Sequence, residues 1–310
     1  MKFGGCIGAL VLLALVVPDA RSANDVNDTS IEIDWSKVRP IEEFDHYWAR
    51  LPPELQVLRQ TRRVNRRVTN GFAAIPGQFP YQVALLPEFL VGTGLCGGTV
   101  LTNIYILTAA HCVVQGVGVI ASGGTAIMGA YDRSIPEPDQ QRIRFSASGI
   151  TVHPQYTALT LRNDIATILL NAPMRYTARV QAIRLPTLSD TRTFAGLLGT
   201  VSGFGRTSDS SLLPSNFVQY ASNPIITNSE CLTYWTPVYL GPENICLSSA
   251  SGRSPCSGDS GGPLTVNSAL GPLQVGLVSF GDSGGCTVGI PSVHARITYF
   301  LQWILNNSDY

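Results

Sequence analysis

The stretch PCSGDSGGPLTVNSALGPLQVGLVSF, residues 255–280, combines a glycine-rich loop with two segments that are typical of strands. Residues 263–267 and 273–280 are rich in Val, Leu and Thr, which suit a pleated, half-buried surface. Because Gly, Pro, Asn or Asp separates most segments of this kind, the pattern predicts an all-β protein, an antiparallel sandwich or barrel. The similar segments are residues 79–86, 98–110, 143–152, 164–171, 180–186 and 199–205.

The last segment of the chain, residues 297–306, has a different periodicity. Its apolar residues stand at positions i, i+3, i+4, i+7 and i+8, namely Ile297, Phe300, Leu301, Ile304 and Leu305. This spacing predicts an amphipathic C-terminal helix.

The composition excludes several classes of protein. The chain has 310 residues, 45% hydrophobic and 14% charged, which is too apolar for a disordered protein. Its 30 Gly and 20 Pro argue against a helical bundle. Lys and Arg total 21, as do Asp and Glu, so the formal net charge is zero. Proteins that bind nucleic acid carry a basic excess, and we therefore expect no nucleic-acid partner.

The first residues have the features of a secretory signal peptide. Lys2 precedes an apolar run over residues 6–17, and small residues follow between Ala20 and Ala23. The run is shorter than the roughly 20 residues that cross a bilayer, although a short membrane anchor is the alternative interpretation. We expect a signal peptide over residues 1–22 and no membrane association of the mature chain.

Cysteine usage agrees with an exported protein. Seven Cys are present, and an even number remains when Cys6 of the signal peptide is removed. An even count in a secreted chain predicts three disulfides, for which 15 pairings are possible. No CxxC pair occurs, so we expect no zinc site. The remaining cysteines are Cys96, Cys112, Cys231, Cys246, Cys256 and Cys286.

Residues 24–67 differ from the rest of the chain in charge density. They hold eight acidic and eight basic residues and end in RQTRRVNRR, after which the glycine-rich start Val68-Thr-Asn-Gly follows. The cluster could be a basic binding patch. Its position directly before the β-rich body favours a cleavable segment instead, which we place at residues 23–67.

Three short motifs carry groups that acyl transfer requires. They are Leu-Thr-Ala-Ala-His111-Cys112, Asn163-Asp164-Ile165-Ala166 and Gly258-Asp259-Ser260-Gly261-Gly262-Pro263. A serine nucleophile needs a base for its proton, a carboxylate to orient that base and backbone donors for the oxyanion. Each motif alone has a structural interpretation, as a histidine beside a cystine, a turn or a flexible loop. Together, they predict a catalytic His, Asp and Ser.

These motifs resemble those of the trypsin/chymotrypsin family of serine proteases, over residues 68–306. The resemblance implies two packed six-stranded antiparallel β-barrels, at about residues 68–185 and 186–310, with the site between them. It makes Ser260 the nucleophile, His111 the acid and base, and Asp164 the orienting carboxylate. The oxyanion hole would be the backbone N–H groups of Gly258 and Ser260.

The resemblance also assigns supporting residues. Ser279 matches the position whose hydroxyl supports the buried Asp. The six cysteines would pair as Cys96–Cys112, Cys231–Cys246 and Cys256–Cys286. Cleavage after Arg67 would free the amine of Val68 to pair with Asp259 and order the oxyanion loop. The prosegment contains no Cys, so we expect it to leave after cleavage.

Substrate choice is inferred from three positions of the primary pocket. The resemblance places Ser254 at its base and Gly281 and Ser292 on its walls. With no carboxylate among them, a buried Arg or Lys would lack a partner, so we expect Phe, Tyr, Leu or Met before the cut bond. Asp282 stands beyond the wall and could tolerate basic residues at the rim. Brachyurin-type arthropod proteases are similar by motif.

Other residues receive simpler interpretations. His153 and His294 are expected at the surface or cleft edge. Ala130 stands where relatives with a calcium loop begin their ligands, and the acids at 132, 137 and 139 do not restore the spacing, so we expect no calcium and no cofactor.

The sequence thus predicts a secreted serine endopeptidase zymogen, digestive and monomeric, whose partners are protein and peptide substrates and an activating trypsin-like protease. A regulatory cascade protease, an elastase- or collagenase-like endopeptidase and an inactive binding homologue are the alternatives.

Overall fold

The computed structural model describes residues 1, 31–51, 56, 71–116 and 118–310. The expected signal peptide and the Arg67–Val68 bond lie outside these residues. Within these ranges, none of the helices has the length and apolarity that a bilayer crossing needs.

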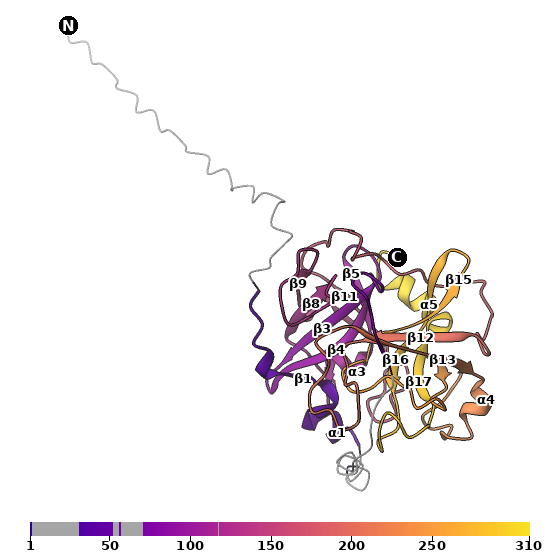
Figure 1. The fold of residues 1–310 in the computed structure, drawn as a ribbon. Helices are drawn as coiled ribbons and strands as arrows, with labels where there is room; N and C mark the ends of the chain where they lie inside the picture. The colour runs from indigo at the N-terminus through magenta and orange to yellow at the C-terminus, as the bar shows by residue number, and fades with distance from the viewer. Residues whose placement is uncertain (2–30, 52–55, 57–70, 117) are drawn as a thin grey trace.

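The first of two large sheets forms the half of the body drawn in purple and magenta (Figure 1). Its antiparallel path is open, with β10 and β9 at the two ends, and β1 (Val38–Pro40) adds to β4 in parallel. The order along the path is β10 (Ile150–Val152), β11 (Ala166–Leu169), β5 (Tyr105–Thr108), β4 (Gly92–Val100), β3 (Gln82–Phe89), β8 (Gly123–Met128) and β9 (Gln141–Ser146).

The second sheet closes into a barrel of six strands, because β12 pairs with both β15 and β13. A seventh strand, β2 (Phe72–Ala73), is added outside on β13. The order is β12 (Leu198–Gly203), β15 (Pro263–Ser268), β16 (Gly271–Phe280), β17 (Ser292–Arg296), β14 (Asn244–Leu247) and β13 (Gln219–Ile226). The expected two-barrel all-β fold is therefore confirmed, except that the first sheet is an open half-barrel.

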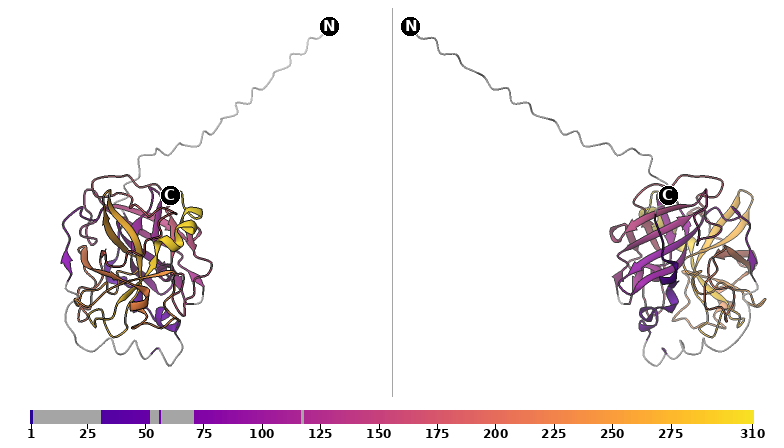
Figure 2. Two further views of the ribbon diagram at one scale, coloured as in Figure 1. Left: turned by 90° about the vertical axis from the view of Figure 1, so that its right-hand side faces the viewer. Right: turned by 60° about the vertical axis from the view of Figure 1, so that its left-hand side comes forward.

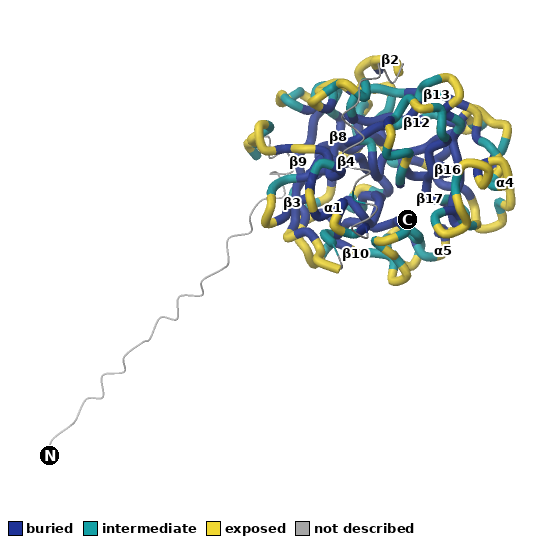
Figure 3. The backbone as a smooth tube through the Cα atoms, turned by 90° about the horizontal axis from the view of Figure 1, so that it is seen from below, coloured by how far each residue is buried: buried dark blue, intermediate teal, exposed yellow. Residues whose placement is uncertain are grey.

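The remaining elements are short, apart from the last helix. The predicted C-terminal helix is α5 (Ile297–Asn306), whose apolar face packs on the core shared by both sheets. Figure 2 shows the two halves side by side, and Figure 3 shows buried chain concentrated along their strands. The other elements are α1 (Asp45–Ala49), α3 (Ala110–Val113), α4 (Asn228–Cys231), the pair β6 (Val114–Gln115) and β7 (Val119–Ile120), and the 3-10 turns 35–37, 41–43 and 147–149.

Candidate active site

His111 is positioned by the short helix α3, which directly follows β5. The disulfide Cys96–Cys112 ties this helix to β4, with 6.1 Å between the two Cα atoms. The side chain of His111 is buried, with 2% of its surface exposed. The other two disulfides join Cys231 to Cys246 and Cys256 to Cys286, the pairs that the resemblance implied.

Asp164 reaches His111 because it stands just before β11, which pairs with β5 and matches Ala166 to Thr108. One carboxylate oxygen, Oδ2, lies 2.7 Å from His111 Nδ1, and the other accepts the backbone N–H of His111 at 2.9 Å. The Ser279 hydroxyl donates to Oδ2 at 2.6 Å. The buried carboxylate thus has three hydrogen-bond contacts, and it fixes the orientation of the imidazole.

Ser260 lies on a loop whose glycines permit close packing. Gly258 and Gly261 have φ of +98° and +80°, a region that other residues seldom adopt. A Cβ at Gly261 would lie 2.3 Å from Thr108 Oγ1. The backbone of the loop is held against β4, since Gly97 N donates to the Ser260 carbonyl at 2.7 Å. The motif therefore brings the serine beside the helix that carries the histidine.

A residue of the charged segment occupies this site. The described part of that segment, residues 31–51, is called the leading segment below. The Ser260 hydroxyl donates to Glu42 Oε1 at 2.5 Å, and Gly258 N donates to Glu42 Oε2 at 3.2 Å. His111 Nε2 is buried with no hydrogen-bond partner in the described chain, and the ring of Tyr47 lies 5.7 Å from the imidazole ring. In this structure, the Ser260 hydroxyl is therefore hydrogen-bonded to the Glu42 carboxylate and not to His111.

Sequence reasoning missed Glu42 and Tyr47. It treated the leading segment as a linker because of its charge density. The available signal was the cluster Ile41, Phe44, Tyr47 and Trp48, since large apolar side chains are uncommon in a solvated linker.

A small cavity of about 50 Å³ adjoins Ser260. Ser254 and Gly281 line it as expected, Asp282 also lines it, and Tyr47 of the leading segment lies at it. The Asp282 carboxylate accepts the N–H of Gly284 at 2.7 Å. The described lining therefore includes Ser254 and the acidic residues Glu42 and Asp282, and no basic residue.

Ser292 is not among the described residues that line this cavity. It is buried, and its hydroxyl lies 3.0 Å from His294 Nε2. The expectation that His294 lies near the surface is wrong, because β17 is an inner strand of the closed barrel and the ring is fully buried. Burial lowers the pKa of His294 to about 3, so the imidazole stays neutral. His153 is half-buried and packs against Phe300 and Trp303 of α5.

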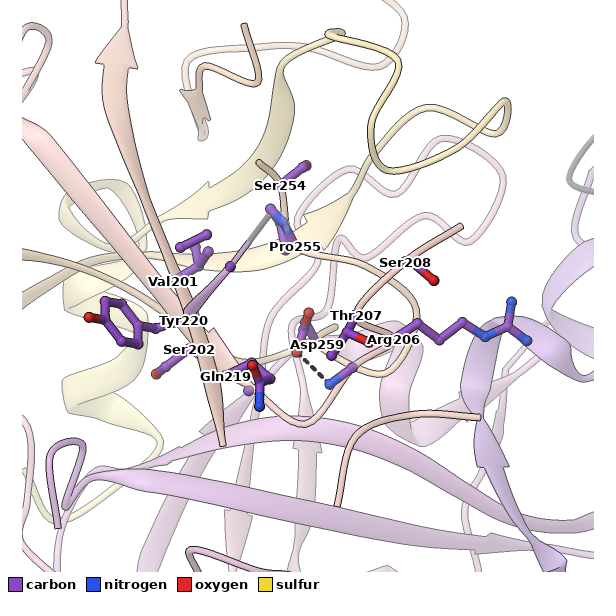
Figure 4. Close-up of a pocket in the computed structure, with 14 residues that line it drawn as sticks. Val201, Ser202, Arg206, Thr207, Ser208, Gln219, Tyr220, Ser254, Pro255 and Asp259 are labelled. Carbon is purple, nitrogen blue, oxygen red and sulfur yellow. Dashed lines mark hydrogen bonds between the residues drawn. The ribbon is translucent and has the colours of Figure 1, made fainter. Parts of the chain in front are cut away.

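Asp259 lines a second cavity, of about 320 Å³, which Figure 4 shows. Its carboxylate accepts the backbone N–H groups of Gly205 and Cys256 at 2.7 and 2.9 Å. No salt bridge involves Asp259 within the residues that are described. Burial raises the pKa of Asp259 to about 6, because the charged form loses hydration. In Figure 4 the Arg206 side chain extends away from this carboxylate.

Arg179 forms salt bridges with two acidic residues, Glu137 and Asp139, of the loop that follows Gly129. Glu137 accepts the N–H groups of Tyr131 and Asp132, and Arg179 lies 3.4 Å from Glu137 Oε1 and 3.5 Å from Asp139 Oδ2. The loop is thus closed by a side chain of the protein itself.

Comparison with known proteins gives consistent relatives. The family model described as Trypsin matches residues 68–304. The chain is 36% identical to "Brachyurin" of Leptuca pugilator over 237 residues, covering 76% of this chain and 96% of that protein. It is 33% identical to "Chymotrypsin" of Phaedon cochleariae over 306 residues, covering 97% and 98%, a match that takes in the charged segment. A solved structure of HL collagenase superposes with a TM-score of 0.68 at 32% identity, covering 78% of this chain and 98% of that one.

Proposed function

Since this chain belongs to the trypsin family and is a serine endopeptidase, we propose that it is an extracellular digestive enzyme, made as a zymogen and specific for large apolar residues before the scissile bond. The apolar run at residues 6–17 and the three disulfides support export into an oxidising compartment. A cysteine-free prosegment supports a degradative role over a cascade role.

The proposed chemistry is acyl transfer through Ser260. Once Glu42 is displaced, His111 Nε2 accepts the hydroxyl proton while Ser260 Oγ attacks the substrate carbonyl. The developing oxyanion is stabilised by the backbone N–H groups of Gly258 and Ser260. His111 then gives its proton to the leaving amine, and water releases the acyl group by the same steps in reverse order. Asp164 keeps the Nδ1 proton of His111 in place throughout.

The proposed activation step is the insertion of a new amine at Asp259. This buried carboxylate lacks a salt bridge in the described residues, and its raised pKa reflects the cost of its charge. Gly203 and Gly205 leave room there, because a Cβ at either would lie within 2.5 Å of the Asp259 carboxylate. Cleavage after Arg67 would supply the ammonium group of Val68, which would pair with this charge and order the loop that carries Gly258.

The observation that carries the proposed specificity is that Ser254 lines the cavity beside Ser260. The resemblance to the family assigns Ser254 to the base of the substrate pocket, where it is a neutral residue. An arginine or lysine entering it would lose hydration without gaining a partner at the base. Apolar side chains gain roughly 25 cal/mol for each Å² that they bury.

The test is kcat/KM of the Arg67-cut protein on matched peptides that differ only in Phe, Leu, Ala or Arg before the leaving group. We expect Phe and Leu to rank first, and Ser254→Asp to raise the value for Arg while lowering it for Phe. Arg67→Gln, treated with the same activating protease, is the control and is expected to stay inactive. Arg ranking first in the wild type contradicts the pocket assignment, and Ala ranking first indicates an elastase-like site.

A further inference from the structure

The leading segment is packed as part of the fold, across the face that holds Ser260 and His111. Its strand β1 matches Val38–Pro40 in parallel with Thr93–Leu95 of β4. Ile41 and Phe44 are 0% and 3% exposed and belong to the main core of the body. A segment held in this way is more than a spacer before the cleavage site.

Two glycines of β4 leave room for these side chains. A Cβ at Gly94 would lie 3.0 Å from Ile41 Cδ1. A Cβ at Gly92, whose φ is +133°, would lie 3.2 Å from Phe44 Cε1. Both distances are shorter than ordinary van der Waals contacts, so this surface of the body is shaped to the leading segment.

Glu42 stands where a substrate's oxyanion would be stabilised. Its carboxylate accepts the Ser260 hydroxyl and the Gly258 N–H, and the side chain is 5% exposed. The same residue is fixed through its backbone, because Trp48 Nε1 donates to the Glu42 carbonyl at 2.7 Å. Hydrogen bonds to an ionised carboxylate are stronger than those to a neutral carbonyl. The Gly258 N–H is one of the two oxyanion donors named above, and the Ser260 hydroxyl is the nucleophile. Glu42 therefore competes with a substrate for the Gly258 N–H and occupies the Ser260 hydroxyl.

The contacts of the leading segment with the site follow one another along the chain. Strand β1 on β4 comes first, Glu42 at Ser260 follows, and Tyr47 at the cavity comes last. The segment thus offers Ser260 a side-chain carboxylate, whereas a substrate offers a backbone carbonyl.

Further contacts anchor the leading segment at both ends. Arg142 Nη1 donates to the Ile31 carbonyl at 2.9 Å, and Arg50 Nη1 donates to the Ala158 carbonyl at 3.2 Å. Between them, Glu43 forms a salt bridge with Arg206. All the anchors in the leading segment lie before residue 52, so a cut after Arg67 leaves them intact.

We propose that the leading segment is a reversible, active-site-directed inhibitor of the cut enzyme, and that its Glu42 carboxylate occupies the oxyanion site until the segment dissociates. The inference rests on the proposed function, since it assumes that Ser260 is the nucleophile. It replaces the expectation that a cysteine-free prosegment leaves once it is cut. Cutting converts an intramolecular contact into a bimolecular one, so inhibition then depends on protein concentration.

The experiment compares full-length wild type, Glu42→Gln and Glu32→Gln, each cut after Arg67 with both pieces kept together. Glu32 is an exposed acid of the same segment and gives a matched control. Activity per molecule on a Phe peptide is measured over a range of dilutions. A synthetic peptide of residues 31–51, with and without Glu42→Gln, is then added to the diluted enzyme. Binding of the same peptides carrying a fluorophore is measured by anisotropy.

We expect the activity per molecule of wild type and Glu32→Gln to rise on dilution. Glu42→Gln should reach full activity at a protein concentration at least about tenfold higher than the concentration at which wild type reaches it. The wild-type peptide should inhibit in competition with substrate, and the Glu42→Gln peptide at least about tenfold more weakly. Equal potency of the two peptides, or activities independent of dilution in all three proteins, overturns the inference. If no protein turns over any peptide, the proposed function fails. Anisotropy then decides the Glu42 contact separately, by whether the wild-type peptide binds more tightly.

Discussion

Replacing Asp259 by Asn in the uncut protein should change how its stability depends on pH. Burial raises the pKa of Asp259 from 3.8 to about 6. A raised pKa in the folded state means that the folded protein binds the proton more tightly than the unfolded chain does. The stabilising contribution of the protonated Asp259 is therefore complete below about pH 4 and is lost as the pH rises through about 6. A difference of roughly 2 pKa units corresponds to at most about 3 kcal/mol of unfolding free energy.

The assay is urea unfolding of Arg67→Gln, which stays uncut, with and without Asp259→Asn, between about pH 4 and about pH 7. The Gly205 and Cys256 N–H groups bond different oxygens of Asp259, and Asn replaces one of these oxygens by an NH2 group, so one bond is lost at every pH. The informative quantity is therefore the slope of the difference between the two proteins. We expect Arg67→Gln alone to lose up to about 3 kcal/mol more than the double variant as the pH rises.

The same comparison on cut protein should give the opposite slope, because an inserted Val68 ammonium favours the ionised carboxylate and lowers the pKa of Asp259. Parallel pH profiles for the two uncut proteins would refute the argument, since Asp259 would then carry no burial cost. Identical slopes before and after cutting would refute the insertion of the amine.

Three further substitutions probe the same site. Ser260→Ala should lower kcat by about 10⁴-fold or more, with an unchanged circular dichroism spectrum, because nucleophile and base act as a unit; near wild-type turnover would exclude Ser260. Ser279→Ala removes the 2.6 Å hydrogen bond to Asp164 and should lower kcat about tenfold at constant KM. The reason is that a hydrogen bond to a charged group contributes about 1.5 kcal/mol or more. A change confined to KM would assign Ser279 to substrate binding instead. Gly205→Ala places a Cβ 2.5 Å from the Asp259 carboxylate. After the cut, with N-terminal sequencing used to check that the new chain begins at Val68, the variant should recover less than about a tenth of wild-type activity. Full recovery would show that the loop moves aside without cost.

The strands that sequence predicted are those with continuous aliphatic character. The segments at 263–267 and 273–280 correspond to β15 and β16, and residues 297–306 form α5. Residues 180–186 were expected to form a strand but make only two isolated bridges, from Val180 to Thr177 and from Arg184 to Leu273. Strands β8, β13, β14 and β17 were missed because Gly, Asn and other polar residues interrupt their apolar pattern, and their pairing is imposed by neighbouring strands.

The candidate site divides in the same way. His111, Asp164 and Ser260 stand in short motifs with recognisable local chemistry, so the sequence alone could predict them as a catalytic set. The partner of Ser260 in the structure is Glu42, which is 218 residues away along the chain. No local pattern reports a contact of that range. The hydrogen bond between Ser292 and His294 could not be predicted either, because the alternation of side chains along β17 does not show which of them form hydrogen bonds.

The salt bridges from Arg179 to Glu137 and Asp139 make the stability of the loop that follows Gly129 sensitive to dissolved ions. The closing charge is the guanidinium of Arg179, which is partly exposed, so monovalent salt screens its attraction to the two carboxylates. The resistance of this loop to proteolysis should therefore fall as the ionic strength rises.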